Sequence, residues 1–195
     1  MINLNTFLNN SLNISILLII VLKDFGLKRL SISSKTEVII DSYYTNVKVL
    51  LDLFSKISFI EYNRLSDMVV YDRPEYKLRY LLIYILTSPL RDSKLRLRSA
   101  VSPEYTILPS VYNTFYSSNW SEREVMDMYG VKFLGHNDLR RILGDYGFWG
   151  FPGRKDFPLV GNHSYLYTIN FLRVFKIRGT IKNFWNLIFQ KSLYK

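Results

Sequence analysis

The stretch YKLRYLLIYILTSPLRDSKLRLRSAV, residues 76–101, alternates side chains of two kinds on both sides of a Ser88-Pro89 turn. Before the turn, every even position from Tyr76 to Leu86 carries Tyr or Leu. After the turn, basic and apolar residues alternate: Lys94, Leu95, Arg96, Leu97, Arg98. A period of two is the signature of a β-strand, because successive side chains point to opposite faces. The pattern predicts an antiparallel hairpin with one basic face, whose first strand becomes buried on both faces as it proceeds.

The chain before this hairpin predicts further strands and one helix. Residues 36–40 predict a short strand, and residues 59–71 predict one or two strands broken near 63–67. Between them, Asp41 or Ser42 can cap a helix with apolar residues at helical spacing: Val47, Leu50, Leu51 and Phe54. We therefore expect an α+β fold, a mainly antiparallel sheet covered by helices and followed by a loop-rich extended C-terminal arm. The expected divisions are residues 1–108, 109–163 and 164–195.

Composition restricts the kinds of site that the chain can build. Its 195 residues are 48% apolar, enough for a real core, and it contains no cysteine. Disulfides, zinc-thiolate sites and cysteine-ligated iron–sulfur clusters are therefore excluded. The net charge of +10 is uneven: six acidic and six basic residues balance over 121–156, whereas 157–195 hold six Lys or Arg and no acid.

The N-terminal region predicts neither a membrane span nor an import signal. Residues 14–22 form a run of nine apolar residues, well short of the ~20 that cross a bilayer. The first 22 residues contain no Lys or Arg, unlike a transit or signal peptide. A single alanine among many Asn, Ile, Lys, Tyr and Phe residues fits a genome rich in A and T, such as that of an organelle.

Charge, glycine and aromatic residues gather in the segment 120–159. Ser121 and Glu124 have capping-box spacing, so we expect a helix that begins at Ser121 and ends at Gly130, with Arg123 able to pair with Asp127. Two acidic residues suit its positive end: Glu122 and Glu124. Its apolar stripe follows helical spacing: Val125, Met128 and Tyr129. The residues from 137 to 144 predict a second, shorter helix, capped by asparagine and ended by glycine.

Catalytic and ligand-binding interpretations of this segment lack support. Its glycines form no phosphate-binding motif, and no H-E-x-x-H spacing accompanies His136 or His163. Ser121 has no nucleophile elbow. Glu122 and Glu124 lie two apart on a helix and cannot flank one bond as acid and base. We expect no catalysis by this chain alone.

Several short motifs nevertheless resemble one known family. They are Glu-Arg-Glu at 122–124, Asp-Met at 127–128, Gly-His at 135–136, Asp-Leu-Arg-Arg-Ile-Leu at 138–143, Asp-Tyr-Gly-Phe at 145–148 and Arg-Lys-Asp-Phe-Pro-Leu at 154–159. This segment resembles the signature of the thirty-kilodalton subunit of respiratory complex I and its bacterial counterpart. Three positions depart from the family's usual proline, histidine, and leucine or methionine: Asn137, Phe151 and Gly153.

The resemblance implies a cofactor-free structural subunit in the peripheral arm of a proton-translocating NADH:ubiquinone oxidoreductase. It implies packing against the forty-nine-kilodalton quinone-module subunit, with flavin, iron–sulfur clusters and quinone in partner subunits. It also implies a peripheral place on the matrix side of the mitochondrial inner membrane. The charged signature residues are the implied partner interface: Glu122, Arg123, Glu124, Asp127, His136, Arg140, Arg141, Arg154, Lys155 and Asp156.

An alternative of another class is a basic organellar RNA-binding or ribosomal protein. The basic and aromatic residues of the tail could neutralise phosphates and stack on bases, or lie on an anionic membrane. An RNA reader should carry its charge in the signature segment too, and that segment is neutral. We therefore expect the tail to dock on other protein subunits and to bind no nucleic acid.

Overall fold

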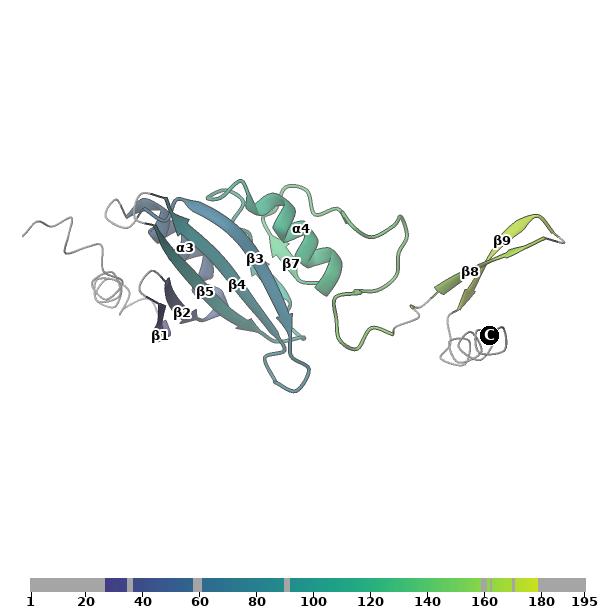
Figure 1. The fold of residues 1–195 in the computed structure, drawn as a ribbon, viewed down its shortest axis with the longest axis horizontal. Coiled ribbons are helices and arrows are strands. Elements are labelled where there is room, and N and C mark those ends of the chain that lie inside the picture. The colour runs from purple at the N-terminus through teal and green to yellow at the C-terminus, as the bar shows by residue number, and fades with distance from the viewer. Residues whose placement is uncertain are drawn as a thin grey trace, which may run out of the picture. The chain divides into compact units, whose positions relative to one another are not determined.

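Five strands form one sheet in the order β1-β2-β5-β4-β3 (Figure 1). Their bounds are β1 Leu27–Ser34, β2 Glu37–Ser42, β3 Arg64–Asp72, β4 Tyr80–Ser88 and β5 Ser93–Val101. Neighbouring strands pair antiparallel except β2 and β5, which pair in parallel. This computed structural model describes residues 27–34, 37–57, 61–89, 92–158, 161, 163–169 and 171–178. The apolar run at 14–22 lies outside these residues.

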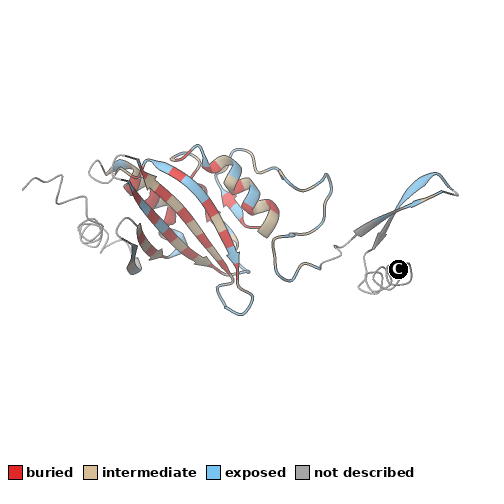
Figure 2. Ribbon diagram, in the orientation of Figure 1, coloured by how far each residue is buried: buried red, intermediate tan, exposed pale blue. Residues whose placement is uncertain are grey.

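The β4–β5 hairpin confirms the alternation of residues 76–101. Leu82 and Leu97 lie fully buried on one face, while Ile83 and Arg98 lie only partly buried on the other (Figure 2). β4 begins at Tyr80, because residues 76–79 belong to a turn. The expectation that this strand becomes buried on both faces is wrong for the described residues, since its odd positions from 81 to 87 remain partly exposed.

One helix lies on the buried face with the apolar stripe predicted for it. In α3, Val47–Lys56, the four buried residues are Val47, Leu50, Leu51 and Phe54. Its predicted caps are wrong, because Asp41 and Ser42 belong to β2. A short 3-10 turn, η2 Tyr44–Asn46, leads into the helix instead, and Asn46 makes no side-chain cap bond.

The predicted break near 63–67 is a bulge within a single strand. β3 pairs with β4 along its length, with one shift of register between Leu65 and Asp67. Two further short strands, β6 Ile107–Pro109 and β7 Lys132–Leu134, pair in parallel and enclose the second helix, α4 Ser118–Tyr129. Val125 of α4 and Phe133 of β7 join the same core cluster as the sheet and α3. The α+β expectation is therefore confirmed.

The chain separates into two units, residues 1–144 and 145–195. The sheet, α3, α4 and the short strands belong to the first. The second contains an irregular segment and a hairpin of β8 His163–Thr168 and β9 Arg173–Arg178, paired antiparallel. The three-part division expected from the sequence stays a prediction. Among the described residues, no helix has the length and apolarity needed to cross a membrane.

Candidate functional site

Helix α4 carries the first charged residues of the signature, and it turns two of their carboxylates inward. The helix begins at Ser118, so the predicted capping box at Ser121 is wrong, and no side chain caps its start. Its end at Gly130 is confirmed: this residue has φ +78° and donates its amide to the Met126 carbonyl. Glu122 and Asp127 are buried, whereas Glu124 is exposed.

Glu122 fixes the loop that enters the helix. Its carboxylate accepts hydrogen bonds from the Ser110 hydroxyl at 2.7 Å and the Val111 amide at 2.8 Å. Burial raises the pKa of the Glu122 carboxyl, and these hydrogen bonds only partly oppose the rise. The fully buried hydroxyl of Tyr84 lies in the same environment, and burial followed by the nearby Glu122 charge raises its pKa. Glu122 therefore stabilises the packing of α4 rather than facing a partner.

His136 lies on the other side of this carboxylate. Its Nε2 is 4.0 Å from Glu122 Oε2, and its side chain is 1% exposed. Its Nδ1 accepts the Asp138 amide at 3.0 Å, so that Nε2 is the protonated nitrogen of a neutral ring. The ring also packs on Tyr112, with centroids 5.5 Å apart. The Glu122–His136 pair thus connects the start of α4 with the turn after β7.

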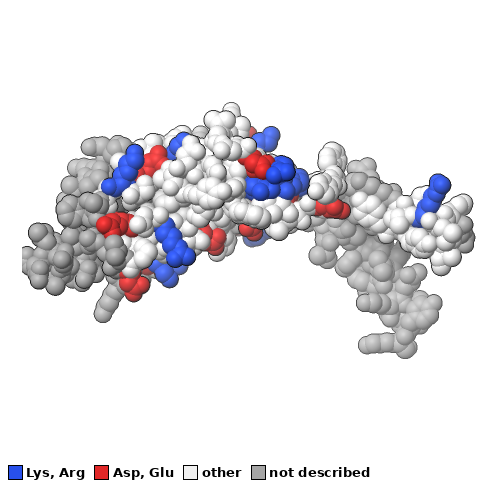
Figure 3. Space-filling view, turned by 90° about the horizontal axis from the view of Figure 1, so that it is seen from above, with Lys and Arg blue, Asp and Glu red and all other residues white. Residues whose placement is uncertain are grey.

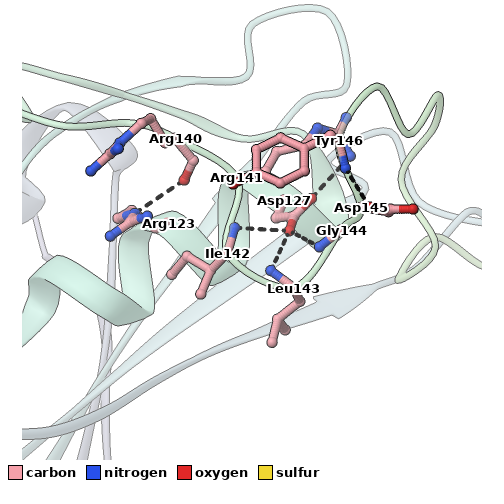
Figure 4. Close-up of polar contacts among 9 residues, drawn as sticks. All are labelled: Arg123, Asp127, Arg140, Arg141, Ile142, Leu143, Gly144, Asp145 and Tyr146. Carbon is pink, nitrogen blue, oxygen red and sulfur yellow. Dashed lines mark hydrogen bonds and ion pairs between the residues drawn. The ribbon is translucent and has the colours of Figure 1, made fainter.

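Asp127 holds the chain after that turn (Figure 4). One of its oxygens accepts the backbone amides of Leu143 at 2.8 Å and Gly144 at 2.7 Å, with Ile142 at 3.2 Å. The other accepts Arg141 Nη1 at 2.9 Å. Burial alone would raise the pKa of the Asp127 carboxyl, but these donors outweigh it and lower the pKa. A buried carboxylate surrounded by donors is a fixed anchor for residues 141–144.

These contacts correct two predictions. Residues 137–144 form no helix, because the amides that would start its hydrogen-bond ladder bind the Asp127 carboxylate instead. Arg123 does not pair with Asp127, which binds Arg141. It donates instead to the Arg140 carbonyl at 3.0 Å and lies over the Trp120 ring at 5.6 Å.

The outer surface beside α4 combines charge with exposed aromatic residues. Arg140 is 78% exposed at its side chain and forms an ion pair with Asp138 at 2.7 Å. Large apolar side chains with more than half of their surface exposed lie on the same elements: Tyr116, Trp120 and Leu134. We call Arg123, Arg140 and these three residues the α4 surface. Its guanidinium groups and aromatic rings are the groups enriched at protein interfaces.

The second unit carries the remaining signature residues. Arg154 is partly buried, with its guanidinium 4.4 Å from the centre of the Phe151 ring, while Lys155 and Asp156 are exposed. Phe148 and Phe157 pack together at 6.1 Å. The hairpin of this unit exposes large apolar side chains: Tyr165, Tyr167, Ile169, Phe171, Leu172, Val174 and Phe175. The sequence pattern predicts a docking tail here but does not predict the hairpin.

The ten residues predicted to form one partner interface lie in different environments. Glu122, Asp127 and His136 lie inside the first unit. Glu124, Arg140, Lys155 and Asp156 are exposed, and Arg123, Arg141 and Arg154 are partly so. The sequence pattern misses the supporting Ser110 and Tyr112, because nothing in their local spacing shows that they reach the signature helix. No group of three or more His, Asp or Glu able to hold a metal occurs among the described residues.

The fold and this arrangement define a class: an α+β domain also found in subunits of respiratory complexes. The trypsin-resistant fragment (1–134) of Nqo5 superposes with a TM-score of 0.52 at 27% identity, covering 63% of this chain and 98% of that one. An archaeal membrane-bound sulfane sulfur reductase shares the fold, with a TM-score of 0.63 at 17% identity over 74% of this chain and 85% of that one. The chain belongs to the family of the 30 kDa subunit of respiratory-chain NADH dehydrogenase, whose model matches residues 43–163.

Relatives from mitochondria-bearing and bacterial organisms agree with this assignment, and the resemblance drawn from the signature is confirmed. NADH-ubiquinone oxidoreductase subunit 9 of Reclinomonas americana is 40% identical over 72% of this chain and 72% of its own length. The NADH-quinone oxidoreductase C-type subunit of a Ruegeria species is 42% identical over 64% and 62%. A rice protein named NADH dehydrogenase [ubiquinone] iron-sulfur protein 3 is 44% identical over 61% and 64%. The chain thus spans slightly under two thirds of the latter two.

Proposed function

We propose that the chain is a structural subunit in the peripheral arm of a proton-translocating NADH:ubiquinone oxidoreductase. In this role it holds the quinone-reducing module together and does not itself carry electrons. Support comes from membership of the family and from relatives named as subunits of NADH-ubiquinone or NADH-quinone oxidoreductases. Flavin, iron–sulfur clusters and quinone belong to partner subunits in this proposal.

The observation that carries the proposal is the inward use of the signature carboxylates. Glu122 fixes the entry to α4, and Asp127 fixes residues 141–144 with three backbone amides. Arg140 lies on the loop between these anchors, and its side chain remains exposed. A loop held at both ends presents its guanidinium group with little loss of conformational entropy on binding.

The partner that suits the α4 surface is a protein subunit with carboxylates, which we propose to be the forty-nine-kilodalton subunit of the quinone module. A guanidinium fork binds a carboxylate through two parallel hydrogen bonds, and desolvation strengthens the pair. Trp120 and Tyr116 supply rigid apolar area next to the charge. Figure 3 shows acidic and basic side chains interspersed on the visible face, which favours a protein partner over a nucleic acid.

The second unit offers a separate docking element in this proposal. The β8–β9 hairpin exposes Tyr167, Phe171 and Val174, each more than half accessible. An exposed apolar group of this kind on a two-stranded hairpin gains stability when a partner covers it. Arg154, Lys155 and Asp156 precede the hairpin and supply charged contacts. We place the assembled subunit on the matrix side of the mitochondrial inner membrane, held through its partners.

Purification of the native protein tests this function. A tagged chain isolated from mitochondria in mild detergent should bring complex I subunits in equal amounts, including the forty-nine-kilodalton one, identified by mass spectrometry. Treatment with RNase should leave that particle unchanged. Recovery with ribosomal proteins, or release by RNase, would contradict the proposal and favour the RNA-binding alternative.

A further inference from the structure

A polar pocket lies on the less buried face of the sheet, apart from the α4 surface. Its volume is about 380 Å³, within the range of small-molecule sites. Seven residues line it: Arg29, Asp41, Ser42, Arg73, Leu81, Arg98 and Ala100. Three of them are arginines and one is a carboxylate, so the lining carries an excess of two positive charges.

The register of the sheet brings these charges together. Arg29 of β1 lies opposite Asp41 of β2, and Asp41 lies opposite Arg98 of β5. The Asp41 carboxylate binds Arg98 through both oxygens, with Nε at 2.6 Å and Nη2 at 3.0 Å. Its capacity is therefore largely used by one arginine. Arg29 forms no ion pair with any residue in the described part of the chain.

Arg73 enters from the turn that follows β3, and its backbone is held in place. Its amide donates to the Arg79 carbonyl at 2.9 Å, and its carbonyl accepts the Tyr76 amide at 3.1 Å. The guanidinium lies over the Tyr76 ring at 4.8 Å. Its Nε is buried and finds no hydrogen-bond acceptor among the residues described. A buried donor without an acceptor costs free energy that an anionic ligand would recover.

The space in the pocket depends on Ala100. This residue lies two positions after Arg98 on the same face of β5, and it pairs with Leu81 across the hairpin. It is the only alanine in the sequence. A larger side chain at this position would extend into the volume that the arginines surround.

We infer that this pocket binds a phosphate group, either free or at the end of a small molecule, through Arg29 and Arg73, with Arg98 as a third positive neighbour. A phosphate dianion matches the excess charge of two, and guanidinium forks bind its oxygens in pairs. The site lies on the sheet face away from the buried core that α4 joins, so it goes beyond the docking role proposed above. Its test uses ligand binding and not assembly, so either proposal can fail without the other.

The test is calorimetric titration of the full-length chain with pyrophosphate, at ionic strength matched with sodium chloride. We expect saturable binding of one equivalent. Arg73→Gln should weaken it at least about tenfold, because one charge-assisted hydrogen-bonding group is lost. Ala100→Leu should weaken it similarly without any change of charge. Arg64→Gln, an exposed arginine at the opposite end of β3, should bind as the wild type does.

A second titration separates the sources of the phosphate. Vesicles of phosphatidylcholine containing phosphatidic acid should compete with pyrophosphate if a lipid headgroup fills the site, and should not compete if the ligand is soluble. Absence of saturable binding of either phosphate compound would overturn the inference. So would equal weakening by Arg64→Gln and Arg73→Gln, since that result indicates only general attraction to the basic chain. If Arg73→Gln does not fold, binding that survives Ala100→Leu would overturn it as well.

Discussion

The Asp127→Asn substitution removes the charge from the carboxylate that anchors residues 141–144 while keeping its size. In the native protein one oxygen accepts three backbone amides and the other accepts Arg141 Nη1. An asparagine has one acceptor oxygen and one amide group that can only donate. If its oxygen keeps the backbone amides, its nitrogen faces the Arg141 guanidinium, and two donors meet.

The cost follows from these contacts. Loss of one hydrogen bond between charged groups removes roughly 1.5–3 kcal/mol, and the three remaining bonds lose their charge assistance. We therefore expect Asp127→Asn to lower the free energy of unfolding of the first unit by about 2–4 kcal/mol. Asp138→Asn is the matched control on the same loop. Its carboxylate pairs with the exposed Arg140 at the surface, so its unfolding midpoint should stay close to that of the wild type.

Urea unfolding at pH 7 measures the midpoint, and amide hydrogen exchange measures the loop directly. Protection of the Leu143 and Gly144 amides should fall in Asp127→Asn and remain in Asp138→Asn. The pH dependence adds a check. Because the folded pKa of Asp127 is lowered, its contribution is present above the ordinary pKa of an aspartate and is lost as the pH falls through the folded value. Equal stability of the two variants, or unchanged protection at Leu143, would refute the anchoring role.

Three further predictions concern the rest of the chain. Glu122 has a raised pKa, so its ionisation weakens folding; the wild type should gain stability as the pH falls from 7 through the folded pKa, and urea titrations of Glu122→Gln should lack that gain. Gly130→Ala forces an L-residue into φ +78° and should cost about 1–2 kcal/mol in thermal unfolding, whereas Gly153→Ala, whose φ is not positive, should cost much less. Truncation after Gly161 should leave a folded subunit by circular dichroism that enters the assembled complex poorly on native gels; normal incorporation would show that the hairpin does not dock.

Local patterns are sufficient to predict the sheet and the end of α4. Alternation over residues 76–101 marks β4 and β5 because one face must be buried and the other need not be. Gly130 marks the helix end because its left-handed conformation is strained for other residues. Both signals depend on neighbours in sequence, so the sequence alone contains them.

The errors lie where distant residues compete for the same backbone groups. Residues 137–144 have caps and apolar spacing suited to a helix, yet Asp127 takes the amides of Leu143 and Gly144. The spacing predicts Glu122 near a positive helix end, yet it lies in the helix interior and binds Ser110 and the Val111 amide. These contacts connect residues 11 to 17 positions apart, beyond the reach of helical periodicity.

The amount of assembled complex in an Arg140→Ala strain, compared with turnover per assembled particle, tests the central claim of a structural subunit most directly. Leaving a partner carboxylate unpaired in a dry interface costs roughly 2–5 kcal/mol, so native gels should show much less complex while each remaining particle oxidises NADH at the normal rate. Arg154→Ala should act in the same direction, and Arg64→Ala, an exposed arginine on β3, should leave both quantities unchanged. Normal assembly with lost turnover would contradict the account and assign Arg140 to the reaction itself.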